Sequence, residues 1–373
     1  MQAAALREAA QGERETERLD RPPRVVRERR RPPLKRIAQL IVLGTLALLI
    51  VGAVLLWGRV SAFNEKVSTA SAASSALFGP LNGKDRVNVL MIGYAGEEKH
   101  GGTYLADSIN ILSIDPATGT TTMVPIPRDF WVEGAPEMPN NGKINEAFAL
   151  GWAKGGIEEA SAAMARVLTR VTGLQIEHWM AIDFAGFREM VDAVGGVTIV
   201  NPRAFGYTWN ETDFHAGRWN GGEFKEGTLH LNGTQALDYA RSRYTSVPAE
   251  SSDFARSVRQ QRILGALKGK LGAGGLGSLG PGLSLMDAMA GRLKTDLSAV
   301  DLFLLSSHLN PDRRIELQED VILQAGRNSA GQYILVVIGR SSATDYRPLH
   351  TWLAERLAEP IATPASSTPA SGG

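Results

Sequence analysis

The sequence predicts an α/β protein: an α/β sandwich with a mixed central sheet, preceded by one transmembrane helix. Two observations carry this prediction. Short apolar runs of the kind found in buried strands alternate with longer segments whose apolar residues recur at helical spacing. Near the N-terminus, residues 37–57 form 21 consecutive residues without a charge, which is long enough to cross a bilayer as a helix.

The N-terminal segment predicts how the chain is oriented in a membrane. Residues 1–36 hold eleven Lys and Arg against six Asp and Glu, with few large apolar residues, so we expect a disordered basic segment. Basic residues at 29–36 flank the apolar run, which places the N-terminus in the cytoplasm and everything after Gly58 outside the inner membrane. The alternative is a signal peptide cleaved near VSA at 60–62, but the apolar run is too long for that.

A linker and three strands come next. Residues 58–85 form an extracytoplasmic linker whose Ser/Ala/Gly-rich part, 61–84, is typical of a tether. The folded domain is expected over 86–359 and opens with strands at 87–93, 108–115 and 121–126. These strands are mostly apolar rather than alternating, which indicates burial on both faces. Pro116 and Gly119 predict a tight turn between the second and third strands.

Helical and strand patterns interleave through the rest of the domain. A helix is expected over 156–173, ending at Gly173, and another over 184–196, stopped by Gly195 and Gly196. The remaining predicted elements are strands at 178–184, 197–200 and 333–339 and helices at 231–242, 253–271 and 348–359. The Pro/Ser/Ala/Thr-rich residues 360–373 are expected to be a disordered tail.

Composition excludes several classes of function. The 373-residue chain has a formal net charge of +1, so the protein as a whole lacks the excess charge of a nucleic-acid binder. It contains no Cys, which excludes disulfides, a thiol nucleophile and a Cys-ligated metal.

Arginines with polar partners recur at three places in the predicted domain. Arg keeps its charge at any accessible pH, and its planar fork of donors fits phosphate oxygens. These places are IPRD at 126–129, RSR at 241–243 and DFARSVRQQ at 253–261. In the predicted helix, Arg256, Arg259 and Gln260 are spaced i, i+3, i+4 and so share one face, with Asp253 one turn earlier. The alternative is a solvated basic face, which is the usual meaning of such charges.

The other candidate residues stand at strand ends. Arg128 follows a strand, where functional groups of α/β sheets gather, and Arg241 and Arg243 point the same way if their segment is extended. Asp107 opens the second strand and is a candidate ligand for Mg²⁺ on a diphosphate, or a simple partner for an arginine. Asp129 is equally open between a metal ligand and a structural partner.

The order of the motifs resembles the LytR-CpsA-Psr family. The resemblance covers roughly residues 86–271, and its motifs appear in this order: VNVLMIG, DSINILSID, VPIPRDFWV, KINEAFA, DFAGFREMVDAVGGVTIVNP, LNGTQALDYARSR and DFARSVRQQ. Each motif alone is modest, but seven in order behind one N-terminal apolar segment are highly specific.

The resemblance implies a fold and an activity. Members are similar in being membrane-anchored transferases that move a glycopolymer from a polyprenyl-diphosphate carrier to peptidoglycan through a phosphodiester. The implied fold is an α/β/α sandwich with an apolar groove for the lipid. The implied catalytic residues, which bind the diphosphate, are Arg128, Arg241, Arg243 and Arg256, with Gln260 as a polar partner. The implied Mg²⁺ ligand is Asp107, and Asp253 either joins it or orients the arginines. We also expect Arg259, Gln260, Asp253 and Lys143 to bind substrate and Asp129 to bind Mg²⁺.

One region departs from the family pattern. Many members carry Asp shortly after the Gly of the first strand and Arg before the motif Asp, where this chain has Tyr94 and Leu105-Ala106. The metal shell is then either incomplete or completed by Glu97, Glu98 or His100.

Three other functions compete with transfer. The first alternative is a protein that uses the same site to bind or hydrolyse a lipid-diphosphate glycan without transferring it. A transcriptional regulator is a second alternative, although residues 1–36 contain no helix-turn-helix pattern. A passive envelope scaffold is the third, and the ordered arginine motifs disfavour it.

Overall fold

We describe the protein from a computed structural model of the whole chain. The structure describes residues 51–55, 57–68, 86–96, 104–272, 287–298, 301–302, 305, 308 and 311–361. The chain divides into two compact units, 1–57 and 58–373. The predicted basic segment 1–36, residues 37–50 of the predicted membrane span and residues 362–373 of the predicted tail lie outside the described residues. Within the described part, none of the helices is long and apolar enough to cross a membrane.

The beginning of the predicted linker is helical rather than extended. Residues 58–67 are helical. Phe63 and Val67 are buried and pack in one cluster with Leu293. The Ser/Ala/Gly composition of the linker as a whole hid these two apolar residues, which are four positions apart and therefore lie on one helical face.

A mixed sheet forms the centre of the second unit, as predicted. Its strand order is β12-β6-β1-β2-β3-β13. The strands are β1 Val87–Tyr94, β2 Ala106–Ile114, β3 Thr121–Pro125, β6 His178–Asp183, β12 Leu293–Thr295 and β13 Arg313–Arg314. β1 runs antiparallel to β2 and parallel to β6. β3 runs antiparallel to β2 and parallel to β13, and β12 runs antiparallel to β6.

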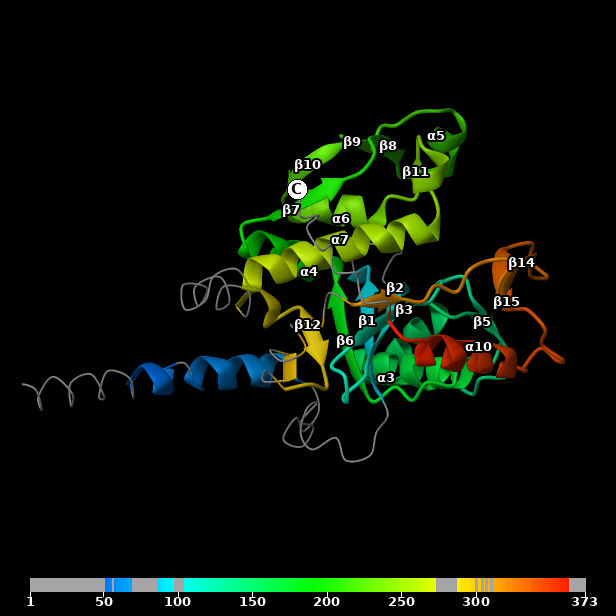
Figure 1. Cartoon of the computed structure of the whole chain (residues 1–373), viewed down its shortest axis with the longest axis horizontal. Helices are drawn as coiled ribbons and strands as arrows, with labels where there is room; N and C mark the ends of the chain where they lie inside the picture. The colour runs from blue at the N-terminus through cyan, green and yellow to red at the C-terminus, as the bar shows by residue number, and fades with distance from the viewer. Residues whose placement is uncertain are drawn as a thin grey trace, which may run out of the picture. The chain divides into compact units, whose positions relative to one another are not determined.

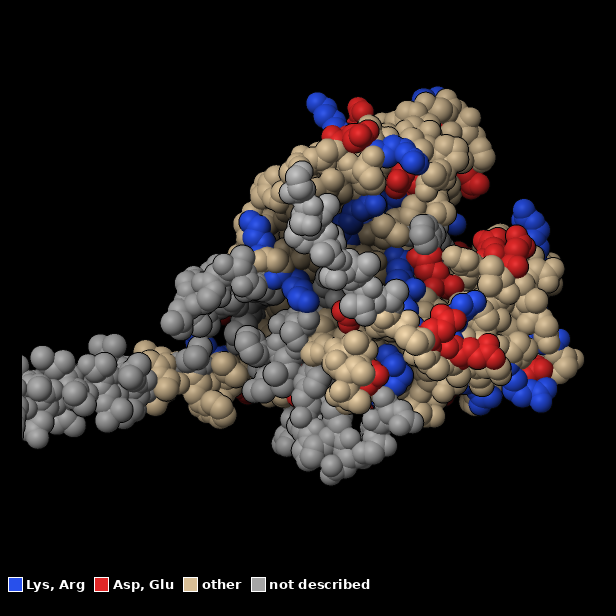
Figure 2. All heavy atoms as spheres, viewed as in Figure 1, with Lys and Arg blue, Asp and Glu red and all other residues tan. Residues whose placement is uncertain are grey.

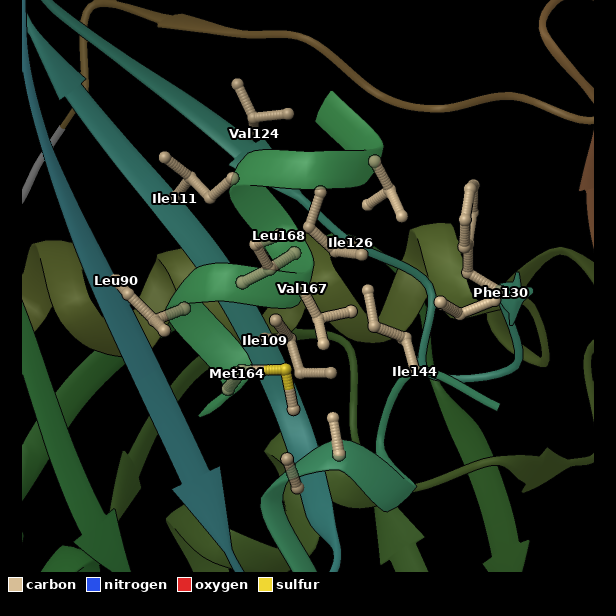
Figure 3. Close-up of a cluster of buried hydrophobic side chains, with 14 of the residues drawn as sticks. Leu90, Ile109, Ile111, Val124, Ile126, Phe130, Ile144, Met164, Val167 and Leu168 are labelled. Atoms are coloured by element: carbon tan, nitrogen blue, oxygen red, sulfur yellow. The ribbon is translucent and has the colours of Figure 1, made fainter. Parts of the chain in front are cut away.

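The apolar runs of the strands are explained by burial on both faces. On one face, strand residues such as Leu90 and Ile111 pack against Met164 and Leu168 of helix α3 (Figure 3). On the other face, alternate residues such as Val89 pack in a second cluster. A strand that is covered on both sides has no polar face, so its sequence reads as a continuous apolar run.

Helix α3, Glu146–Thr172, begins ten residues before the predicted start. It is interrupted at Gly155 and Gly156, whose backbone angles are not helical, and it ends at Gly173 with φ of 74°, as predicted. The pair of glycines breaks the apolar periodicity, so the pattern indicated only the second part. Helix α10, Arg347–Ala358, packs beside α3.

A second helical layer carries the residues that matter for function. It contains α4 Phe184–Ala193, α6 Gly233–Arg241 and α7 Asp253–Gly272. Their apolar side chains form a separate hydrophobic cluster. In Figure 1, α6 and α7 lie on the opposite side of the sheet from α3 and α10.

Short strands complete the unit and were mostly not predicted. The predicted strand at 197–200 is β7, Val197–Asn201, but it pairs with β10, Gly227–Leu231, instead of joining the central sheet. The others are β4 Trp131–Val132, β5 Gly142–Lys143, β8 Phe205–Thr208, β9 Gly222–Phe224, β11 Tyr244–Thr245, β14 Leu323–Arg327 and β15 Tyr333–Val337, with short helices α5 Glu211–His215 and η3 Pro248–Glu250. β15 confirms the predicted strand at 333–339 and forms a hairpin with β14.

Candidate active site

Two cavities meet over the first residues of β2. The first has a volume of about 500 Å³ and the second about 640 Å³. Figure 2 shows basic side chains within the recess beneath the α6–α7 layer. The residues that line both cavities are Asp107, Ser108, Asn110, Arg243, Arg256, Ser257 and Gln260. We call these seven residues the shared floor. They come from β2, from the start of α7 and from the segment after α6.

Arg128 reaches the first cavity because the chain turns directly after β3. The amide of Ile126 donates to the carbonyl of Ile109 (2.9 Å), which extends the pairing with β2, and the amide of Phe130 then closes a turn onto Pro127 (3.0 Å). At this turn, Nη1 of Arg128 donates to Oδ1 of Asp107 at 3.0 Å. Arg128 and Asp107 both line the first cavity, so the predicted pair at the strand ends is present.

Asp129 lines the second cavity, and its carboxylate is paired with Lys143. Nζ of Lys143, in β5, lies 2.5 Å from Oδ1 of Asp129, and Nε of Arg128 lies 3.6 Å from its Oδ2. The Asp129 side chain is buried. Lys143 does not line either of the two cavities. Of the two readings of Asp129, this arrangement supports a structural partner that orients Arg128, and it gives Lys143 the same structural role.

Arg241 and Arg243 face the first cavity together, although their segment is not extended throughout. Arg241 is the last residue of α6, and Ser242 leaves the helix with φ of −51° and ψ of 120°. Both arginines line the first cavity. The guanidinium of Arg241 stacks 4.1 Å from the ring centroid of Phe184 and 5.2 Å from that of Trp209. These cation–π contacts help to fix the position of the guanidinium.

Arg259 is not at the cavities, contrary to the expectation that it binds substrate. Its side chain is fully buried. Nε donates to the carbonyl of Tyr239 (2.8 Å), Nη1 to Oε2 of Glu250 (2.8 Å), and Nη2 to the carbonyl of Ser242. Burial lowers the pKa of Arg259, and Glu250 opposes that shift. Arg259 instead ties α7 to the segments that carry Arg241 and Arg243.

Gln260 joins α7 to β2. Its Oε1 accepts from the hydroxyl of Ser108 at 3.1 Å, and that hydroxyl accepts from Nδ2 of Asn110 at 3.0 Å. Ser108 and Asn110 were not singled out from the sequence. The signal was present, because they are polar residues two apart in an otherwise apolar strand and therefore point to the same face. The side chain of Asp253, at the start of α7, lies outside the described residues.

The walls of the two cavities differ in chemistry. Beyond the shared floor, the first cavity is largely apolar and is lined by Met91, Met180, Ile182, Phe187, Leu237, Leu264 and Leu293. The second has a mixed lining beyond the floor, in which apolar residues such as Ile126 and Leu317 alternate with polar ones. The polar residues are Asp129, Ser251, Ser252, Arg314, Glu316, Gln318, Glu319 and Tyr333. An apolar residue of a cavity wall has the same sequence pattern as one of a closed core, so the pattern did not locate the first cavity.

Tyr94 belongs to the core and not to a metal shell. Its ring centroid lies 5.2 Å from that of Phe148 and 5.7 Å from that of Trp152, and Tyr104 stacks on Trp152 at 3.9 Å. Burial raises the pKa of Tyr94. The three residues proposed to complete the shell, Glu97, Glu98 and His100, lie outside the described residues.

Asp107 is the carboxylate that best fits a metal ion. Across the described ranges, no three His, Cys, Asp or Glu side chains group in a way that could hold one. Mg²⁺ is usually held by one or two carboxylates together with substrate phosphates and water. Asp107 lines both cavities beside the arginines and fits such a role. Asp129 lines only the second cavity, and its Oδ1 is already bonded to Lys143.

Comparison with known proteins identifies relatives of the chain. A sequence model of the LytR_cpsA_psr family matches residues 55–344. The polyisoprenyl-teichoic acid–peptidoglycan teichoic acid transferase TagU of Enterococcus faecalis (strain ATCC 700802 / V583) is 28% identical over 258 residues, which are 69% of this chain and 76% of that protein. The transferase of the same description called TagV, from Bacillus subtilis (strain 168), is 30% identical over 63% of this chain and 57% of that protein. The crystal structure of B. subtilis TagV aligns over 76% of this chain and 100% of that chain, with a TM-score of 0.52 at 22% identity, so the two share a mixed α/β fold.

Proposed function

The chain belongs to the LytR_cpsA_psr family, and we propose that it is a phosphotransferase that moves a glycopolymer from a polyprenyl-diphosphate carrier onto peptidoglycan. Its curated relatives are named as polyisoprenyl-teichoic acid–peptidoglycan teichoic acid transferases. The observation that carries the proposal for this chain is the group of arginines, Arg128, Arg241, Arg243 and Arg256, in the largely apolar first cavity, where it adjoins a second cavity of mixed lining.

The substrate's parts match the parts of the site. The proximal isoprene units of the carrier lie against the apolar wall of the first cavity, because burial of apolar surface is favourable. The diphosphate lies over the floor, where Arg128, Arg241, Arg243 and Arg256 donate charge-assisted hydrogen bonds to its oxygens.

Phosphoryl transfer needs positioning and charge stabilisation more than covalent participation by the protein. A sugar hydroxyl of peptidoglycan attacks the phosphorus that bears the glycan, polyprenyl phosphate leaves, and the hydroxyl proton is released. The arginines stabilise the negative charge that develops on the equatorial and leaving oxygens. Asp129 and Lys143 act indirectly, by fixing the direction of Arg128.

We also propose that the reaction uses Mg²⁺ or another divalent cation. Asp107 would hold it together with the diphosphate oxygens. The ion would neutralise part of the charge on the diphosphate.

Substitution of the cavity arginines tests the proposal. In the full-length protein, Arg256→Ala or Arg128→Ala should lower transfer from a lipid-diphosphate glycan to peptidoglycan by about 10²–10³, as loss of one preorganised donor does elsewhere. Arg203→Ala is the control, because Arg203 is exposed and does not line either cavity. Wild-type transfer by Arg256→Ala and Arg128→Ala would show that the site is wrongly assigned.

The product distinguishes transfer from hydrolysis. Incubation with the lipid-linked glycan should give a peptidoglycan-linked phosphodiester when peptidoglycan is present. Release of free glycan phosphate at the same rate with and without peptidoglycan would instead identify a pyrophosphatase.

We propose that residues 37–57 anchor the enzyme in the inner membrane with its C-terminal unit outside the cytoplasm. The support is the uncharged run of 21 residues behind a basic flank. A topology reporter fused to the C-terminus should be active on the extracytoplasmic side. A cytoplasmic signal would contradict the anchor orientation and would favour the regulator hypothesis.

A further inference from the structure

We infer that the second cavity receives the peptidoglycan sugar that accepts the glycopolymer, and that Glu316 takes the proton from its attacking hydroxyl. This inference rests on the proposed function and adds to it a site for the second substrate. Part of the lining of the second cavity comes from residues 314–335, which lie beyond the predicted arginine motifs.

The two cavities extend toward different edges of the central sheet. Apart from Met123 of β3, the strands of the sheet that line the first cavity are β12, β6, β1 and β2. The second cavity is lined by the end of β3 and the residues after it, and by Arg314 of β13, the strand at the opposite edge from β12. Asp107 and Ser108 of β2 lie between and line both.

In-line displacement assigns one substrate to each side. The attacking and leaving oxygens stand roughly opposite each other at the phosphorus. If polyprenyl phosphate leaves toward the largely apolar first cavity, the attacking hydroxyl must approach the phosphorus from the opposite side of the shared floor. The second cavity opens on that side.

The lining of the second cavity suits a carbohydrate. Its volume of about 640 Å³ lies within the usual range for a small-molecule site. The Tyr333 hydroxyl donates to Oε1 of Glu319 at 2.5 Å, and the residue is 39% exposed. A fixed aromatic ring beside carboxylate and amide groups, here Glu319 and Gln318, offers a surface for the apolar face of a sugar and acceptors for its hydroxyls.

Glu316 is placed to accept a proton. Its side chain is 13% exposed and its Oε1 lies 2.5 Å from Nε of Arg314. Burial raises the pKa of Glu316, and Arg314 opposes that shift. A carboxylate whose pKa moves toward the working pH is a better general base. The other charged groups that line this cavity are Asp107, Asp129, Arg243, Arg256 and Glu319.

The transfer forms one bond to phosphorus, breaks another and moves one proton. The hydroxyl oxygen of the acceptor sugar forms a bond to the phosphorus that bears the glycan. The bond from that phosphorus to the bridging oxygen breaks, and its electron pair leaves with polyprenyl phosphate. The hydroxyl proton passes to the carboxylate of Glu316.

Acceptor kinetics of the full-length protein in detergent test the inference, with a polyprenyl-diphosphate glycan as donor and a soluble peptidoglycan fragment as acceptor. Glu316→Gln should lower kcat about 10²–10⁴-fold and remove the acid limb of the pH–rate profile, because an amide cannot take a proton. Glu316→Asp should retain that limb at a reduced rate. Tyr333→Ala should raise KM for the acceptor about tenfold, whereas Tyr333→Phe, which keeps the ring, should raise it less.

A matched control and the donor readout decide the outcome. Glu355→Gln changes an exposed glutamate of α10 that is not in the lining of either cavity, and it should leave both constants unchanged. Wild-type acceptor kinetics in Glu316→Gln and Tyr333→Ala, with transfer lost in Arg256→Ala, would overturn the inference and leave the proposed function standing. A rise in KM for the donor instead of the acceptor would assign the second cavity to the donor glycan and would also overturn it. No transfer by the wild-type protein would count against the proposed function itself.

Discussion

Arg256 and Arg259 are one helical turn apart in α7, and their surroundings differ completely. Arg256 lines both cavities. Arg259 is fully buried and donates to Glu250 and to backbone carbonyls of the segments around α6. A residue spacing of three places two side chains about 60° apart around a helix, which is enough to put one in a cleft and the other in the core.

This difference predicts opposite effects of the same substitution. Arg259→Ala should lower the free energy of unfolding by about 3–5 kcal/mol, because it leaves the Glu250 carboxylate buried without its partner. Arg256→Ala should change the free energy of unfolding by about 0.5 kcal/mol or less, while transfer is lost. Urea denaturation of both variants measures the difference. Similar stabilities for the two would mean that the Arg259–Glu250 pair contributes little to folding.

The sequence predicted most of the site's residues, but not how they divide between chemistry and support. Arg128, Arg241, Arg243 and Arg256 line the first cavity as expected, and their catalytic roles stay predictions. The phosphate-binding signal in an arginine is its charge and shape, which Arg259 shares. Arg259 lies in the core because tertiary packing places Glu250 and the carbonyls of α6 around it. The sequence pattern does not show this.

Helix α6 places Arg241, and two features at its start hold it. Asn232 and Gln235 form a capping box, in which the Asn232 side chain accepts from the amide of Gln235 and the Gln235 side chain accepts from the amide of Asn232. At Gly233, an added Cβ would lie 2.3 Å from the carbonyl oxygen of Arg188 in α4. The two helices therefore approach closely because this residue has no side chain.

Two glycine-to-alanine substitutions in helices should change the stability of the protein in opposite directions. Gly233→Ala should destabilise the protein by about 1–3 kcal/mol, because α6 must move away from α4. Gly269→Ala, in α7, has nothing within 4 Å of the added Cβ and should stabilise by about 0.5–1 kcal/mol through helix propensity. Thermal or urea unfolding of each variant checks both signs. A neutral Gly233→Ala would show that the helices can separate at little cost.

The longer elements were predictable, and the shortest were not. β1, β2, β3, β6, α4, α6, α7 and α10 begin within two residues of the predicted positions. Strands of two to four residues, such as β4, β5 and β8, are too short to show a period. The pairing of β7 with β10 depends on a contact across 26 residues between Asn201 and Gly227, and local pattern carries no information about it.

Two of the hydrophobic clusters in the second unit are the largest in its described residues, and the elements that form them also line the first cavity. One cluster joins the sheet to α3 and α10, and the other joins α4, α6 and α7 to β7 and β8. Residues of β1, β6 and β12 line the cavity together with residues of α4, α6 and α7. A ligand in this cavity therefore contacts both layers at once.

Ligand binding should stabilise the whole unit. A short-chain prenyl diphosphate at a hundred times its Kd should add about 2.7 kcal/mol to the stability of the folded protein, seen as a rise in Tm of the full-length chain in detergent. Arg256→Ala should abolish most of the rise, and the corresponding prenyl alcohol should give little. An equal rise with the alcohol would mean that the arginines do not contribute to binding.

The resemblance seen in seven ordered motifs is confirmed by the family match over residues 55–344. The mixed α/β fold is confirmed as well. The aromatic packing of Tyr94 explains one departure from the family pattern, since a core position has replaced an expected polar one. The expectation of a membrane anchor falls mostly on residues outside those the structure describes.

The two cavities are built from different stretches of one chain on a common floor. Residues of the first come mainly from 180–264, whereas the second draws on 314–335. Mutations in residues 314–335 therefore alter the second cavity and leave the first cavity unchanged. With the acceptor assigned to the second cavity as we infer, such a layout lets evolution change the recipient of the polymer without changing the cavity that takes the lipid carrier.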